Sequence, residues 1–186
     1  MLEYNLPTIL TLLRIASIPL LVVLYYLPWQ YSNIACTVIF ILAALTDWLD
    51  GYLARKMGQE TAFGAFLDPV ADKLMVAIVL VLIVQSEASM TIAIPAAVII
   101  GREITIASLR EWMAEIGQRR HVAVSQMGKW KTTAQMVAII CLLYSSDLFN
   151  LPIKDIGYAL LYLAAVLTLW SMISYLSVAL KTINEK

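Results

Sequence analysis

Four aspartates within 26 residues are the part of this sequence most capable of chemistry. Asp47 and Asp50 close one apolar stretch, and Asp68 and Asp72 open the next. Spacings of three and four residues place each pair on one face of a helix. Because a short connection makes the two helices antiparallel neighbours, the four carboxylates are expected to meet near one point.

Carboxylates brought together repel one another, and a divalent cation is their natural counter-charge. Oxygen ligands without histidine or cysteine suit Mg²⁺ or Mn²⁺, whereas zinc usually takes nitrogen or sulfur. We therefore predict that the four aspartates bind one or two such ions. Taken singly, two of them have simpler interpretations: Asp68 before Pro69 could be a helix N-cap, and Asp50 before Gly51 could form a turn.

Small residues continue the acidic face of the first helix. Asp47, Gly51 and Ala54 occupy one helical stripe, and such a stripe lets a planar or phosphorylated ligand approach the backbone beside the metals. Close packing of helices through small residues is the competing explanation, and both can hold at once.

The composition predicts that these residues sit in a membrane protein. The chain is 61% hydrophobic and 14% charged, whereas a soluble domain is about 45–50% apolar and about 25% charged. Its net charge of zero gives no basic field that would indicate nucleic acid as a partner. The amino-terminal apolar segment lacks a basic region before it and a small-residue cleavage pattern, so we expect it to be retained.

Six apolar stretches separated by short polar breaks are candidates for membrane helices, which need about 20 residues to cross the apolar core of a bilayer. They are Leu6–Leu27, Asn33–Arg55, Phe66–Gln85, Thr91–Trp112, Lys129–Tyr144 and Ile156–Leu180. No room is left between them for a soluble domain. The predicted fold is therefore all-α, with six transmembrane helices in one bundle and a single domain over residues 1–186.

The positive charges predict the orientation of this bundle. An even number of spans puts both termini on one side of the membrane, and basic residues favour the cytoplasmic side. One side carries Arg55, Lys56, Arg119, Arg120, Lys129, Lys131, Lys181 and Lys186, and the other carries Lys154 alone. We therefore expect the aspartates and both termini to face the cytoplasm.

Several basic residues lie within or at the ends of the predicted helices. Arg14, Arg102 and Arg110 are inside apolar stretches, where a charge usually lines a polar cavity; the alternative is that the long side chains reach the membrane interface. Arg102 and Arg110 lie two turns apart on one helix face. Together with Lys131, they are candidates for binding a phosphate group.

The acidic motif resembles a known family signature. Its spacing is Asp47-x2-Asp50-Gly51-x2-Ala54-Arg55-x8-Gly64-x3-Asp68-x3-Asp72, which is similar at every position to that of the CDP-alcohol phosphatidyltransferases. The segments Asn5–Arg14, Gly101–Trp112 and Gly128–Gln135 look like the branch of this family that uses glycerol 3-phosphate. Thr8 departs from it, because many members carry asparagine there.

The resemblance implies a six-helix homodimer in the bacterial cytoplasmic membrane, with a cytoplasm-facing cavity that holds two divalent ions and a CDP-lipid. By this likeness the four aspartates bind metal, and Asp72 is also the candidate general base. Four further residues would line the CDP site: Gly51, Ala54, Arg55 and Gly64. The implied reaction transfers the phosphatidyl group of CDP-diacylglycerol to glycerol 3-phosphate and releases CMP.

Two alternatives stay open at this point. The same chemistry could use another acceptor, such as inositol phosphate or serine. Arg102, Arg110 and Lys131 favour an acceptor substrate that carries its own phosphate over serine. A divalent-cation transporter could use the acids as an ion path, but transporters place their ligands near the bilayer midplane on broken helices. Here the acids are expected at helix ends.

Overall fold

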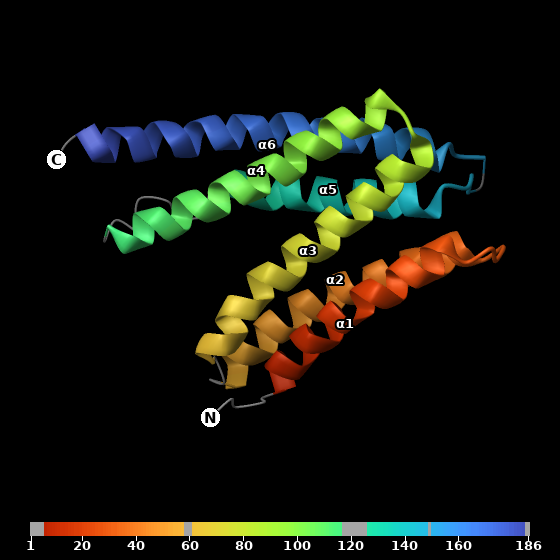
Figure 1. Ribbon diagram of the computed structural model, residues 1–186, viewed down its shortest axis with the longest axis horizontal. Helices are drawn as coiled ribbons and strands as arrows, with labels where there is room; N and C mark the ends of the chain where they lie inside the picture. Colours follow the sequence, from red (N-terminus) through yellow and green to blue (C-terminus); the bar gives the residue numbers. More distant parts are fainter. Residues whose placement is uncertain (1–5, 58–60, 117–125, 149, 185–186) are drawn as a thin grey trace. The chain divides into compact units, whose positions relative to one another are not determined.

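A computed structural model describes residues 6–57, 61–116, 126–148 and 150–184 of the chain (Figure 1). At 6–7, 48, 50–57, 62, 65, 126–130 and 178–184 it describes the backbone alone. The described residues form six helices: α1 (Leu6–Tyr26), α2 (Ser32–Met57), α3 (Ala62–Glu87), α4 (Met90–Glu115), α5 (Gln126–Tyr144) and α6 (Ile153–Asn184). Apart from one isolated bridge between Leu148 and Leu151, these ranges contain no strand pairing. The predicted all-α fold is confirmed, and each helix overlaps its predicted stretch.

The surface of these helices is that of a membrane protein. Three of them contain an apolar segment long enough to cross a bilayer: Thr8–Tyr26, Met90–Glu115 and Ile153–Ser177. Large apolar side chains point outward from them, as at Val23 and Trp170, which are 61% and 66% exposed. Lipid is the solvent that such a surface requires. The apolar segments of α2 and α5 are shorter, so six crossings stay a prediction.

The chain divides into two compact units, each described by itself. The first contains Met1–Ser86 with Leu143–Ser146, and the second contains Glu87–Leu142 with Asp147–Lys186. In the first unit α1 lies along α2 (Figure 1). The buried positions of α1 are spaced three or four apart, which is the spacing of one helix face. They are Thr8, Thr11, Arg14, Ile18 and Leu21. The buried stripe of α1 is therefore apolar toward the carboxyl end and polar toward the amino end.

In the second unit α4 lies along α6 (Figure 1). Ile106, Leu109 and Met113 of α4 form a buried cluster against Met172 and Leu176. The buried face of α4 also carries a charged residue, Arg102, among apolar ones. This packing brings one basic side chain of α4 into the interior of the unit.

Helix α6 also crosses α5 closely, at Gly157. A Cβ atom added to this glycine would lie 2.9 Å from Leu142 Cγ and 3.0 Å from Cys141 Cβ. Both distances are shorter than carbon atoms tolerate without a shift. The absence of a side chain at residue 157 therefore permits the close approach of α5 and α6.

A polar cluster connects Glu87, the last residue of α3, with the first turns of α6. Glu87 accepts hydrogen bonds from Lys154 Nζ at 2.8 Å and from the Tyr158 hydroxyl at 2.9 Å. Burial acts to raise the pKa of the Glu87 carboxyl, but its hydrogen bonds to Lys154 and Tyr158 and the charge of Lys154 outweigh burial and hold that pKa below its ordinary value. Lys154, the basic residue on the side of the bundle that is expected to carry few of them, is thus paired with Glu87.

Candidate active site

Arg14 is the charged residue of α1's buried stripe, and its partner is the first aspartate of the motif. Its Nη1 donates a hydrogen bond to Asp47 Oδ1 at 2.7 Å. The Arg14 side chain is buried, whereas the Asp47 side chain is 46% exposed. A buried guanidinium requires a compensating charge, and Asp47 supplies it, so the Arg14 side chain is paired in the interior and does not reach the surface.

Thr11, one turn before Arg14, holds the third aspartate. Its buried Oγ1 donates to Asp68 Oδ1 at 2.5 Å. Two residues three positions apart on α1 therefore orient one carboxylate of α2 and one of α3. Sequence reasoning assigned Thr11 no role, although polar residues at positions 8, 11 and 14 of an otherwise apolar segment were the available signal.

The first residue of this polar stripe, Thr8, packs at the start of α3. Its Oγ1 lies 3.3 Å from Thr61 Oγ1, and Thr61 Oγ1 accepts a hydrogen bond from Gly64 N at 3.0 Å. A Cβ atom on Gly64 would lie 3.0 Å from Thr61 Oγ1 and 3.3 Å from Thr8 Oγ1. Gly64 is thus a position where α1 and α3 approach closely, and this structural role exists beside its predicted contact with CDP.

The backbone excludes the two simpler interpretations of the aspartates. Helix α2 continues to Met57, so Asp50 and Gly51 are helical and do not form a turn. Helix α3 begins at Ala62, so Asp68 lies in its second turn and is not an N-cap, and Pro69 lies inside the helix. Both alternatives are wrong because each helix extends past the point where its apolar run stops or starts.

The structure describes three of the four predicted metal ligands by their side chains. Asp47 and Asp68 are both bound to α1, and Asp72 is half-buried one turn after Asp68. Among the residues described with side chains, no three acidic, histidine or cysteine residues are grouped closely enough to hold a metal ion. For four predicted site residues the structure describes the backbone alone: Asp50, Gly51, Ala54 and Arg55. Convergence of all four acids stays a prediction.

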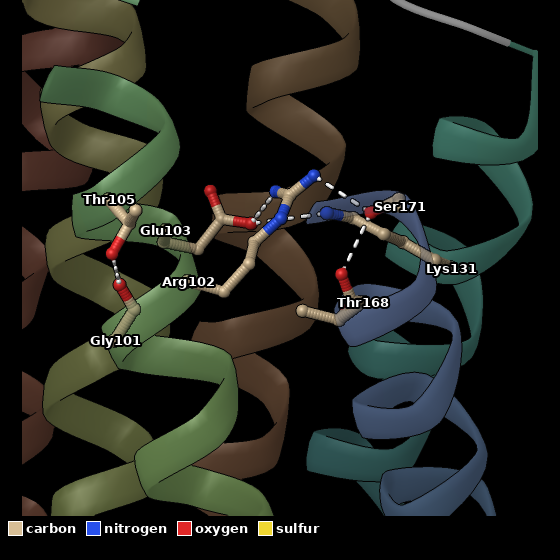
Figure 2. Close-up of polar contacts among 7 residues, drawn as sticks. All are labelled: Gly101, Arg102, Glu103, Thr105, Lys131, Thr168 and Ser171. Atoms are coloured by element: carbon tan, nitrogen blue, oxygen red, sulfur yellow. Dashed lines mark hydrogen bonds and ion pairs between the residues drawn. The ribbon is translucent and has the colours of Figure 1, made fainter. Parts of the chain in front are cut away.

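In the second unit, Arg102 and Lys131 meet at one carboxylate oxygen (Figure 2). Arg102 Nη1 lies 2.5 Å from Glu103 Oε1, and Lys131 Nζ lies 3.4 Å from the same atom. Arg102 Nη2 also donates to Ser171 Oγ at 3.2 Å. Three helices, α4, α5 and α6, each contribute to this cluster, and α4 supplies both Arg102 and Glu103. Two of the predicted acceptor-binding residues are thereby brought together.

In this cluster two cations share one carboxylate, and some buried polar atoms have no hydrogen-bond partner among the described atoms. Arg102 and Lys131 are only 6% and 4% exposed, and Glu103 is their shared carboxylate. Arg102 Nε and Thr168 Oγ1 are buried without a hydrogen-bond partner among the described atoms. Buried donors are normally satisfied, so the cluster has the chemistry of a site for an anion.

Arg110, the third predicted acceptor residue, lies outside the Glu103 cluster. Its side chain is exposed, and its guanidinium carbon lies 5.7 Å from the centre of the Tyr175 ring. Arg102 contacts Ser171, one turn before Tyr175, so both arginines lie on one face of α4, as predicted, and the structure shows that this face is turned toward α6. Arg102 and Arg110 both lie within electrostatic range of Lys131.

The fold and the site define a class: an all-helical membrane protein in which hydrogen bonds between helices orient aspartates and in which cationic side chains form a buried cluster. The sequence model of one family, CDP-alcohol phosphatidyltransferase, matches residues 4–170. The chain belongs to the CDP-alcohol phosphatidyltransferase family, so the resemblance seen in its motif is confirmed.

Relatives in several bacteria share nearly the whole chain. A protein of Pectobacterium atrosepticum is 55% identical over 177 residues, which are 95% of this chain and 96% of the relative. Proteins of Salmonella choleraesuis and Sodalis glossinidius are 54% and 55% identical over the same shares of both chains. All three carry the name CDP-diacylglycerol–glycerol-3-phosphate 3-phosphatidyltransferase.

Proposed function

We propose that this protein transfers the phosphatidyl group of CDP-diacylglycerol to sn-glycerol 3-phosphate, forming phosphatidylglycerophosphate and CMP. The observation that carries the proposal is the identity of 54–55% over 95% of the chain to enzymes with that name. The family signature at residues 47–72 supports the same chemistry. Membership of this family disfavours the alternative of a divalent-cation transporter.

The four aspartates, Asp47, Asp50, Asp68 and Asp72, would hold Mg²⁺ or Mn²⁺, as two ions. The donor set fits, because it offers carboxylate oxygens alone and because the pairing with Arg14 leaves Asp47 about half exposed. When bound, such ions neutralise the charge that develops on a departing phosphate. The chain itself contributes orientation: Arg14 and Thr11 fix the directions of Asp47 and Asp68.

Four residues next to the aspartates would line the CDP site: Gly51, Ala54, Arg55 and Gly64. The first three lie on the last turns of α2, and Gly64 lies in the first turn of α3. Small residues there let the ligand approach the backbone. Arg55 supplies a positive charge for a phosphate oxygen.

Asp72 is the proposed general base. It takes the proton of the primary hydroxyl of glycerol 3-phosphate, and the hydroxyl oxygen attacks the phosphorus that carries diacylglycerol. The bond from that phosphorus to the oxygen of CMP breaks, and CMP leaves with the electron pair. A carboxylate within hydrogen-bond reach of the hydroxyl is sufficient for this proton transfer.

The acceptor's own phosphate would bind Arg102, Lys131 and Arg110. Support comes from the uncompensated positive charge of the Glu103 cluster and from the unpartnered Nε of Arg102. Charge-assisted hydrogen bonds to phosphate are the strongest that such side chains make. Serine carries no phosphate, so this cluster favours a phosphorylated acceptor.

We place the enzyme in the bacterial cytoplasmic membrane as a homodimer, with its active site and both termini facing the cytoplasm. The orientation is supported by the distribution of basic residues: most of them are expected on the side of the aspartates, and Lys154 alone is expected on the other side. The homodimer follows from the family resemblance. Membrane lipids are then both the solvent of the protein and the source of its CDP-lipid substrate.

The choice of acceptor is tested by incubating purified protein with CDP-diacylglycerol, Mg²⁺ and one acceptor at a time. Glycerol 3-phosphate should release CMP, whereas inositol phosphate and serine should release little above the level without acceptor. Release of CMP with inositol phosphate or serine, but not with glycerol 3-phosphate, would overturn the proposed activity.

A further inference from the structure

Glu103 has no part in the proposed reaction, yet one of its carboxylate oxygens contacts both Arg102 and Lys131 in the second unit (Figure 2). We infer that Glu103 is the positioning residue of the acceptor site, where one of its carboxylate oxygens, Oε1, holds the guanidinium of Arg102 and the ammonium of Lys131 together for the phosphate of the acceptor. The inference rests on the proposed function, because it takes these two cations as the acceptor's phosphate ligands.

The geometry gives Glu103 this role through Lys131 more than through Arg102. Arg102 has a second anchor, since its Nη2 donates to Ser171 Oγ, which itself donates to the Thr168 carbonyl at 2.9 Å. Within the part of the chain that the structure describes, Lys131 Nζ makes its hydrogen bond to Glu103 Oε1. Lysine has a flexible four-carbon stem. Its position in the cluster therefore depends on Glu103.

Charge supports the same conclusion. Two cations repel strongly when both are buried, because little water screens them. One carboxylate in contact with both cations allows both to stay in the cluster before any ligand arrives, and it still leaves one positive charge uncompensated. A phosphate monoester carries nearly two negative charges at neutral pH. It can therefore bind to cations that Glu103 has already assembled.

The test replaces Glu103 by glutamine, which keeps the volume and an acceptor oxygen but removes the charge. For Glu103→Gln, the KM for glycerol 3-phosphate should rise about 10-fold or more, the loss expected when a charge-assisted contact to phosphate is weakened. The KM for CDP-diacylglycerol and kcat should stay within about threefold of wild type, the margin left for small indirect effects. Glu103→Asp restores the charge one methylene further away and should give an intermediate KM.

Glu115→Gln is the matched control, because Glu115 is an exposed glutamate on the same helix. It should leave both KM values unchanged. A Glu103→Gln enzyme with the KM of the Glu115→Gln control, or with a lowered KM for glycerol 3-phosphate, would overturn the inference. Equal increases in both KM values would also overturn it, because they indicate a structural role.

Lys131→Ala separates this inference from the proposed acceptor site. If Lys131→Ala raises the KM for glycerol 3-phosphate and Glu103→Gln does not, only the positioning role of Glu103 fails. If neither variant changes that KM, the acceptor site and the inference fail together, while CMP release by the wild-type protein still tests the overall activity. Should Glu103→Gln not fold, the KM of Glu103→Asp decides: an unchanged value for glycerol 3-phosphate contradicts the inference, and a selective rise supports it.

Discussion

Arg14 and Asp47 form an ion pair in the first unit, with 2.7 Å between Nη1 and Oδ1. The guanidinium is buried on α1, and the carboxylate is about half exposed near the end of α2. The pair therefore connects a residue outside the family's acidic motif to the first aspartate within it. Its position makes Arg14 a determinant of where the Asp47 carboxylate lies.

Removing this charge should impair the reaction more than the fold. Arg14→Met keeps much of the buried volume but loses the ion pair, so kcat/KM for CDP-diacylglycerol should fall by about 10-fold or more, the effect of one charge-assisted hydrogen bond. Arg14→Lys keeps the positive charge but lacks the planar guanidinium, so its kcat/KM should fall less than that of Arg14→Met. Steady-state kinetics at saturating glycerol 3-phosphate measure both. An Arg14→Met enzyme within about threefold of wild type would show that the pair does not contribute to activity.

The acidic residues should be needed for their charge. Asp68→Asn can still accept the hydrogen bond of Thr11, and Asp72→Asn keeps its volume, yet neither amide supplies the charge that a divalent ion needs. Both variants should lose turnover while their thermal midpoints stay within a few degrees of wild type. EDTA should abolish wild-type activity, and added Mg²⁺ or Mn²⁺ should restore it. Full activity in EDTA would contradict the proposal that the aspartates bind a divalent ion needed for the reaction.

The helices were predictable from the sequence, because apolar stretches separated by polar breaks fix where a chain can cross a membrane. The predicted and observed bounds of α1 differ by a single residue at its carboxyl end, Leu27 against Tyr26. The ends of α3 were less predictable: it begins at Ala62, four residues before the predicted start. Thr61 and Asp68, on either side of this extra turn, contact Thr8 and Thr11 of α1, and sequence patterns do not report such partners.

The site was predictable in its residue types and less so in its contacts. The spacing of the aspartates indicated helix faces, but the contact between Thr11 and Asp68 joins residues 57 positions apart. Glu103 and Lys131 are likewise 28 positions apart. Which polar side chains meet across helices depends on how the helices pack, so the contacts of Thr11 and Glu103 appear only in the structure.

The acceptor residues should affect one substrate selectively. Arg110→Ala should lower kcat/KM for glycerol 3-phosphate by about 10- to 150-fold, the range for one lost charge-assisted contact to phosphate, while CDP-diacylglycerol still binds. If Arg110 is instead an anchor at the headgroup level, expression or insertion should fall and the surviving protein should have near-normal kinetics. A folded double variant, Arg110→Ala with Lys131→Ala, that stays within about threefold of wild type would remove both residues from the acceptor site.

The polar cluster at Glu87 should make the thermal stability of the protein depend on pH in the acidic range. The pKa of the Glu87 carboxyl is lowered in the folded protein. The contribution of ionised Glu87 to the free energy of unfolding is therefore fully present above its pKa in the unfolded chain, and it is lost as the pH falls through its pKa in the folded protein. At pH 7, Glu87→Gln should lower the thermal midpoint by about 2–4 °C, as a contact of this kind does in a chain of this size. The difference from wild type should shrink as the pH approaches 4. A difference that is the same at both pH values would contradict this origin.

The orientation in the membrane can be measured by labelling single cysteines in a variant that lacks Cys36 and Cys141. A cysteine near Arg119, in the connection between α4 and α5, should react with an impermeant reagent only from the cytoplasmic side. A cysteine near Asp147 should react only from the opposite side. The reverse pattern would overturn the orientation derived from the basic residues.

The most direct test of the proposed reaction follows one oxygen atom. Glycerol 3-phosphate labelled with ¹⁸O in its primary hydroxyl is incubated with the enzyme and CDP-diacylglycerol, and the lipid product and CMP are analysed by mass spectrometry. The account predicts phosphatidylglycerophosphate that retains the label and CMP that lacks it, because the hydroxyl oxygen attacks the phosphorus that carries diacylglycerol. The absence of a labelled lipid product, or the label in the cytidine-containing product, would contradict it.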